Sequence, residues 1–319
     1  MFSLLRSGLF AVSVLASSMA CAQYETSAPI TLVVAQAAGS GTDTASRLLA
    51  DALSRSIGRQ IVVENKPGAL GTIAAMHVAK AKPDGMTLLM TGGTAITGAP
   101  FLMPDLQLNP QKDLTPVYRV AGSSLVLYVG ASQGINTVRE FLERVRGNPG
   151  KYSYAGSHSM NMVAMEAYKK AMQLQMTYVP YKGGPQALTD LVNGNVLAMF
   201  NDVAGTAGME SSGRVKGLAV MRKERLPEFP DLPTIYEAGY KGPEISVWTG
   251  VFVPAGTPQK TVDYLSTEIA KVAARPEFKQ QMNKLGLELY QGGTQQAFKE
   301  FIRQETDALG PYIKAARTQ

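Results

Sequence analysis

The chain has 319 residues, 31 Lys and Arg against 25 Asp and Glu, and a single cysteine. Its net charge of +6 is scattered along the chain. It is not gathered into a basic stripe with interleaved aromatic residues, which argues against a nucleic-acid-binding protein. One cysteine excludes a disulfide framework, so a hydrophobic core has to hold the fold, and a chain of this length can bury enough apolar surface to do so.

Residues 1–22 have the pattern of a secretory signal peptide. Arg6 precedes an apolar run too short to span a bilayer, and the segment ends on an A-x-A cleavage site around Cys21. Lipidation of Cys21 as the first mature residue is the alternative. It fits less well because Ser18 stands where an aliphatic residue is expected. We therefore expect an exported, periplasmic protein.

The first part of the mature chain alternates short apolar runs with amphipathic stretches. The pattern predicts strands over 30–35, 61–64 and 87–91, and helices over 44–56 and 71–81. Apolar strands separated by helices indicate a parallel sheet that is covered on both faces.

The same alternation restarts after residue 113. Residues 114–130 are long enough for two successive strands, and later strands are expected over 151–155, 176–180, 196–200, 216–221 and 245–254. Intervening helices are predicted over 138–146, 161–172 and 185–193, and two more, about 258–273 and 294–316, end the chain. The sequence thus indicates two α/β units, in which ligands bind at the carboxyl ends of the strands.

A glycine-rich turn follows the first strand and opens a helix. Gly39, Ser40, Gly41, Thr42 and Asp43 would present free N–H groups and the positive end of the helix dipole to an anion. No lysine follows the second glycine, so this is not a phosphate loop, and the dinucleotide fingerprint lacks its third glycine. The alternative is a plain helix start with Thr42 or Asp43 as the N-cap.

A second donor-rich loop, "YAGSHSMNM", also joins a strand to a helix. Ser157, His158, Ser159 and Asn161 offer hydroxyl, imidazole and amide groups beside the helix start. A lone histidine in such a loop is more often a surface residue than a ligand contact. Two donor-rich helix starts, one from each α/β unit, nevertheless predict two loops that face each other across a cleft.

Other chemistry is weakly supported. Ser132 lies in a G-x-S-x-G pattern, but only His158 follows it, and the acids between them fall in an exposed-looking helix, so a serine hydrolase is the disfavoured alternative. His77 and His158 are the only histidines, which gives no metal-ligand spacing. We expect neither a metal nor another cofactor.

Taken together, the motifs resemble one family, the Bug-type extracytoplasmic receptors of tripartite tricarboxylate transporters. The matching segments run in order over nearly all of the mature chain: "AGSGTDTASR", "VVENKPGALGTIAA", "AKPDGMTLL", "YVPYKGGPQALTDLVNG", "LAMF", "VKGLAV", "FPDLPTIYEAG" and "VWTGVFVPAGTP".

The resemblance implies a two-domain periplasmic binding fold of the type II Venus-flytrap kind, each domain a parallel-rich sheet flanked by helices. The implied domains are 23–122 with 225–319, and 123–224. The chain would act as a monomeric receptor, not an enzyme, that delivers a small carboxylate to the membrane subunits of the transporter. A ligand sensor for a signalling partner is the other reading. Tyr181, Lys182 and Gly183 match the family's turn beside the cleft.

Three departures bear on the ligand. Gln36 and the two alanines after it replace the family's Phe-Pro-Pro, Met162 stands where histidine is frequent, and Asn201 stands where aspartate is common. A polar side chain replaces an aromatic wall, and a negative charge is lost. These changes suggest a bulkier or aromatic carboxylate, with a dicarboxylate still open.

Overall fold

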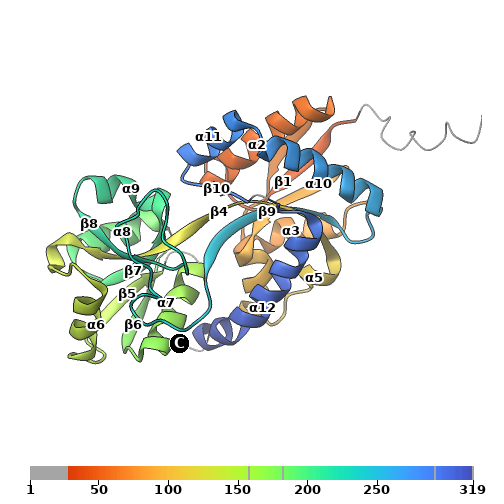
Figure 1. Cartoon of the computed structure of the whole chain (residues 1–319). Helices are drawn as coiled ribbons and strands as arrows, with labels where there is room; N and C mark the ends of the chain where they lie inside the picture. The colour runs from red at the N-terminus through yellow and green to blue at the C-terminus, as the bar shows by residue number, and fades with distance from the viewer. Residues whose placement is uncertain (1–27, 157–158, 182, 291, 318–319) are drawn as a thin grey trace, which may run out of the picture.

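The computed structural model describes residues 28–156, 159–181, 183–290 and 292–317. Two lobes stand side by side and are joined by long strands (Figure 1). The strand order is β2-β1-β3-β9-β4-β7-β5-β6, with β10 and β8 also paired to β4. This confirms the predicted α/β fold class, in which helices flank the sheet of each lobe.

The first lobe is built on β1 (Ile30–Val34), which lies parallel between β2 (Ile61–Asn65) and β3 (Thr87–Gly92). Successive β1 side chains point to opposite faces, so one face takes Ile30, Leu32 and Val34 and the other takes Val33. The continuous apolar run is therefore explained by burial on both faces.

Helices cover each face of this lobe. On one face pack α2 (Gly41–Ile57), α10 (Gln259–Ala273) and α11 (Pro276–Lys284). On the other pack α3 (Thr72–Ala79) and the first half of α12 (Gln295–Arg317). Helix α11 was not predicted from the sequence.

The second lobe has β5 (Tyr152–Gly156) parallel to both β6 (Met176–Pro180) and β7 (Ala198–Asp202), with β8 (Val215–Val220) beside β4. Its helices are α6 (Val138–Arg146), α7 (Ser159–Met172), α8 (Gly184–Asn193) and α9 (Val203–Ser211).

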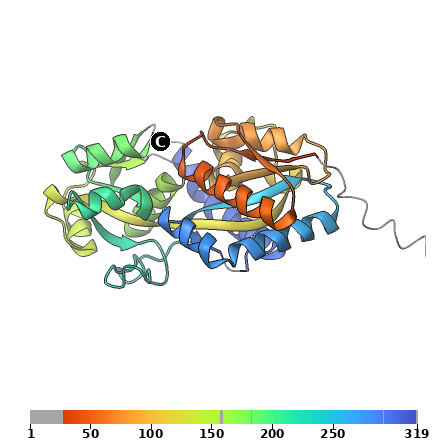
Figure 2. The same ribbon diagram turned by 90° about the horizontal axis from the view of Figure 1, so that it is seen from above.

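Two strands cross between the lobes. Residues 114–130 form one strand, β4 (Leu114–Gly130), not the two that were predicted. It pairs antiparallel with β9 (Ser246–Pro254) as far as Ser124, and with β7 and β8 from Leu125 onward. The strand does not break because new partners take over its hydrogen bonds where β9 begins. Figure 2 shows β4, in yellow, running through both lobes.

Helix α12 provides a second connection. Its residues Phe298 and Ile302 are buried in the first lobe, while Leu309 and Ile313 are buried in the core of the second. One helix thus contributes to both cores.

Short elements complete the chain. They are η3 (Ala69–Gly71), the π-helical turn η4 (Thr94–Gly98), α4 (Ala99–Leu102), α5 (Pro110–Asp113), η5 (Ala131–Gln133) and β10 (Glu288–Leu289). Within the described ranges, no helix combines the length and the apolarity that crossing a membrane requires.

The contact between β3 and β9 is tight enough to test. A Cβ added at Gly92 would collide with the main-chain carbonyl oxygen of Trp248. We expect Gly92→Ala to lower the free energy of unfolding by about 1–3 kcal/mol, as overpacking does. Gly208, inside α9, has open space around it, so Gly208→Ala is the matched control and should stabilise by roughly 0.5–1 kcal/mol. Urea unfolding of both variants measures this, and equal midpoints would refute the packing argument.

Candidate functional site

The first predicted loop forms the start of α2. Ser40 is the N-cap, and its Oγ accepts a hydrogen bond from the N–H of Asp43 at 3.2 Å. This corrects the alternative in which Thr42 or Asp43 caps the helix. Gly39 has φ +82°, the left-handed region that glycine adopts without steric cost. The N–H groups of Gly41 and Thr42 occupy the first helical positions, where no intrahelical acceptor exists.

Asp43 is turned into the protein and not toward a ligand. The residue is 3% exposed, and its carboxylate accepts from the Gly39 N–H at 2.9 Å, Arg47 Nε at 3.0 Å and Asn65 Nδ2 at 2.8 Å. Burial alone would raise the pKa of Asp43, but these hydrogen bonds outweigh it and lower the pKa below its ordinary value. Asp43 therefore holds the loop in shape, and the Gly39 N–H is used inside the loop.

Gln36 lies just before this turn. Its main-chain carbonyl accepts from Asn65 Nδ2 at 3.0 Å, while its side-chain Oε1 is buried and finds no donor among the described residues. A buried acceptor without a partner is costly, so a ligand or water donor is the natural partner for this oxygen.

The second predicted loop is described only in part, since Ser157 and His158 lie outside the described residues. Ser159, the first residue of α7, donates from Oγ to Thr94 Oγ1 at 3.0 Å. Thr94 opens η4 directly after β3, in the other lobe. This hydrogen bond brings the two lobes into contact beside the start of α7.

Thr94 was missed in the sequence analysis, although a signal was present. The segment Thr91-Gly92-Gly93-Thr94 ends a strand with two glycines and a hydroxyl residue. Because β3 lies next to β1 and parallel to it, its carboxyl end comes out at the same edge as the Gly39 loop.

A chain of hydrogen bonds fixes Asn161 and Asn201. Thr206 Oγ1 donates to the carbonyl of Asp202 and accepts from Asn201 Nδ2 at 2.9 Å, and Asn201 Oδ1 accepts from Asn161 Nδ2 at 3.1 Å. Asn161 Oδ1 then remains buried with no donor among the described residues. The two predicted residues are thus brought together, and Asn161 is left offering an acceptor.

The residues after β6 are less informative. Lys182 lies outside the described residues, and Gly183 is the N-cap of α8. The Tyr181 hydroxyl donates to Asp190 Oδ2 at 2.6 Å, and burial together with this carboxylate raises the pKa of Tyr181 to about 12. The hydroxyl is therefore used within its own lobe.

The described part of the chain holds no metal-ligand cluster and gives Ser132 no basic partner, while His158 lies outside the described residues. Ser132 lies in η5, and its hydroxyl donates to the carbonyl of Val192, a group that cannot act as a base. No group of three or more His, Cys, Asp and Glu side chains suited to a metal ion occurs among the described residues.

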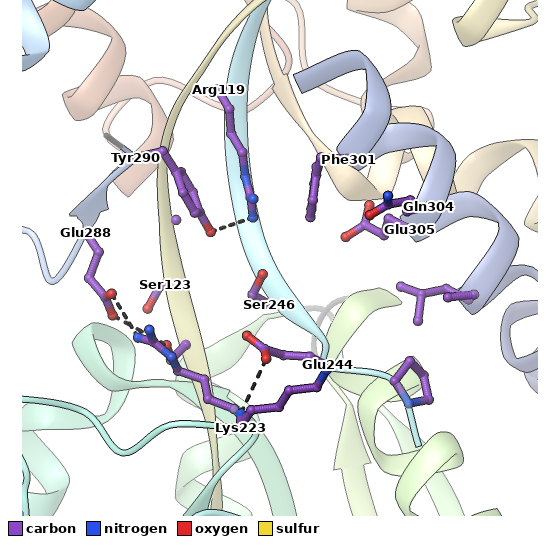
Figure 3. A pocket seen from close by; sticks show the side chains of 16 residues that line it. Arg119, Ser123, Lys223, Glu244, Ser246, Glu288, Tyr290, Phe301, Gln304 and Glu305 are labelled. Carbon is purple, nitrogen blue, oxygen red and sulfur yellow. Dashed lines mark hydrogen bonds and ion pairs between the residues drawn. The ribbon is translucent and has the colours of Figure 1, made fainter. Parts of the chain in front are cut away.

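A cavity of about 430 Å³ lies elsewhere, at the junction of the lobes (Figure 3). Its lining comes from β4, from Arg222 and Lys223 after β8, from the segment that enters β9, from β10 and from α12. It shares no lining residue with the predicted loops. We call it the hinge cavity.

The Asp43 network makes a pH-dependent prediction. Because the folded state lowers the pKa of Asp43, its stabilising effect is complete above the unfolded pKa and is lost as the pH falls through the folded pKa. We expect Asp43→Asn to lower the free energy of unfolding by about 1–3 kcal/mol at pH 7. The difference from the wild type should shrink as the pH falls below 4. Urea unfolding from pH 7 to pH 3 measures it; a difference that stays constant would contradict the assignment.

Comparison with known proteins extends over most of the chain. Residues 45–317 match the Tripartite tricarboxylate transporter family receptor domain, TctC. A UPF0065 protein of Bordetella bronchiseptica is 36% identical over 296 residues, which are 92% of this chain and 88% of that protein.

Two solved structures from Rhodopseudomonas palustris share the fold. MatC with bound malate is 28% identical, covers 89% of this chain and 98% of its own, and has a TM-score of 0.76. A second protein, solved with adipate, is 29% identical, covers 90% and 97%, and has a TM-score of 0.80. The chain described here belongs to the receptor family of tripartite tricarboxylate transporters.

Proposed function

We propose that this protein is a periplasmic receptor that captures a small organic carboxylate between its lobes and delivers it to the membrane subunits of a tripartite tricarboxylate-type transporter. The observation that carries the proposal is the hydrogen bond between Ser159 and Thr94, which joins the start of α7 to the start of η4. We infer that the two lobes meet around a ligand beside this contact.

The chemistry of this junction suits a carboxylate. The start of α2 offers the free N–H groups of Gly41 and Thr42 beside the positive end of a helix dipole. The Thr94 hydroxyl accepts from Ser159 and keeps its own proton to donate to a carboxylate. A hydrogen bond to a charged group contributes about 1.5–3 kcal/mol, so a few of them hold a carboxylate without a salt bridge. The malate and adipate found with the two R. palustris proteins support this ligand class.

Two buried acceptors without a donor bear on which functional groups the ligand carries. Gln36 Oε1 and Asn161 Oδ1 are both buried without a donor among the described residues. A carboxylate has no proton to donate to these two oxygens. They would therefore accept hydrogen bonds from water or from a hydroxyl or amino group of the ligand.

The lobes would close around the ligand as a monomer. We place the bend at residues 122–125, because β4 exchanges β9 for β7 as its partner there. We propose the expected division, 23–122 with 225–319 and 123–224, with one change. The segment before β9 goes to the second lobe, because its Ile235, Tyr240 and Ile245 are buried in the core of that lobe. A ligand shifts such an equilibrium only by its differential affinity for the closed state over the open state.

A thermal-shift series tests the proposal. We expect malate or adipate to raise the melting temperature of ligand-stripped protein, and the corresponding amides to leave it unchanged. At a hundred times the dissociation constant, the stabilisation should be about 2.7 kcal/mol. If neither these acids nor a wider panel of carboxylates shifts the transition, the ligand class is wrong.

Two substitutions locate the site. Thr94→Val and Ser159→Ala each remove one side of the contact between the lobes, so each should raise the dissociation constant by up to about tenfold. Ser132→Ala is the control and should bind as the wild type does. Unchanged binding in both cleft variants, measured by calorimetry, would remove the basis for placing the ligand there.

A further inference from the structure

The hinge cavity contains an arginine, Arg119, that has no carboxylate partner among the described residues. Arg119 lies between the rings of Tyr290 and Phe301, with its Cζ 3.5 Å from each ring centroid. It donates to the Tyr290 hydroxyl at 2.6 Å. No carboxylate of the described residues lies within 4.0 Å of its guanidinium, and its buried Nε has no acceptor there. Figure 3 shows the guanidinium between the two rings, pointing into the cavity.

The carboxylates that line the same cavity are engaged elsewhere. Glu288 pairs with Arg222 at 3.0 Å, and Glu244 accepts from the main-chain N–H of Lys223 at 3.3 Å. Glu305 is buried and accepts from Trp248 Nε1, at 2.8 and 2.9 Å, and from Thr97 Oγ1 at 2.6 Å.

Burial without a partner is expensive for a guanidinium. Loss of hydration lowers the pKa of Arg119, and the fields of Tyr290, Glu305 and Glu244 offset this only in part. A partly buried cation of this kind is stabilised when an anion completes its hydrogen bonds. The planar fork of arginine suits a carboxylate, which it can bind through two parallel hydrogen bonds.

The other residues that line the hinge cavity indicate what kind of ligand could bind beside Arg119. Ser123, Ser246 and Gln304 add hydroxyl and amide groups near Arg119, while Pro243, Phe301 and Leu309 supply apolar surface. A second carboxylate would find only the exposed Lys223 as an unpaired cation, at the cavity wall. The volume of about 430 Å³ accommodates a molecule the size of a substituted benzoate.

We propose that the hinge cavity is a second ligand site, which binds a monocarboxylate with an apolar body through Arg119. This site is separate from the cleft described above and does not depend on the function proposed for that cleft. Because its walls come from both lobes, an occupant contacts the chain on both sides of the bend.

The test uses 4-fluorobenzoate as the probe and the full mature chain. Fluorine NMR titration should show binding to the wild type, and Arg119→Gln should raise the dissociation constant by about tenfold to a hundredfold. Arg119→Lys keeps a cation but loses the fork, so it should also bind more weakly than the wild type. Arg303→Gln, which changes an arginine paired on the outer side of α12, is the matched control and should bind as the wild type does.

A crystal structure with 4-bromobenzoate locates the probe independently of variant stability. An anomalous bromine peak among Phe301, Pro243 and Leu309, with the carboxylate on Arg119, supports the site. A peak only beside Thr94 and Ser159, or no binding at all, overturns it. Affinity that is equal in the wild type and both Arg119 variants also overturns it.

Thermal shifts with adipate and malate, measured on the same Arg119 variants, test the two proposals independently. The shifts should persist when the hinge site is lost. If the acids fail to stabilise even the wild type while 4-fluorobenzoate still binds through Arg119, the function proposed for the cleft fails and the hinge site stands.

Discussion

The antiparallel pairing of β4 with β9 is the constraint on which the rest of the structure depends. β4 continues without a break from one lobe into the other, so the lobes cannot slide past each other without losing main-chain hydrogen bonds. Glu305 strengthens the junction, because one buried carboxyl group ties α12 to β9 through Trp248 and to η4 through Thr97. Burial raises the pKa of Glu305 to about 7, so the energy of this tie depends on its protonation. We infer that the lobes bend where β4 changes partner.

The carboxylate of Asp43, beside the proposed binding site, is neutralised by partners within its own loop and the neighbouring residues. Asp43 is compensated by Arg47 and by two neutral donors, so the turn presents main-chain N–H groups and hydroxyls instead of a formal charge. The hinge cavity is the reverse case, since Arg119 keeps a full charge there without a carboxylate beside it. The two proposed sites would therefore recognise anions in two ways, one by dipoles and one by a guanidinium.

The features that depend on residues close together in the chain were correctly predicted from the sequence. The apolar run at β1 and the Ser40 to Asp43 helix start depend on neighbouring residues, and both were recognised. The chain after residue 114 was divided wrongly because residues 114–130 are long enough for two strands, whereas distant partner strands keep the whole segment extended as one. β10 is only two residues long and exists through pairing with Ala121 and Gly122. The rings around Arg119 come from residues 171 and 182 positions further along, which no spacing rule connects.

Helix α11 illustrates the limit of periodicity. Its buried apolar residues are Phe278 and Met282, one pair at i and i+4, which is too little to distinguish a helix from a loop. The contact of Thr94 with Ser159 was hidden for another reason. The sequence indicated which strand ends carry polar residues, but the choice of Thr94 depends on how η4 folds back against α7.

The ion pair between Arg222 and Glu288 connects the lobes on the hinge side, whereas the contact across the cleft joins two uncharged hydroxyls. Dissolved salt weakens the attraction between exposed charges, most strongly beyond a Debye length of about 10 Å at 0.1 M, and leaves neutral hydrogen bonds largely untouched. Ionic strength therefore acts more on the hinge-side contact than on the contact between the hydroxyls. A rise in salt concentration would shift the balance between the two contacts without any change in the receptor itself.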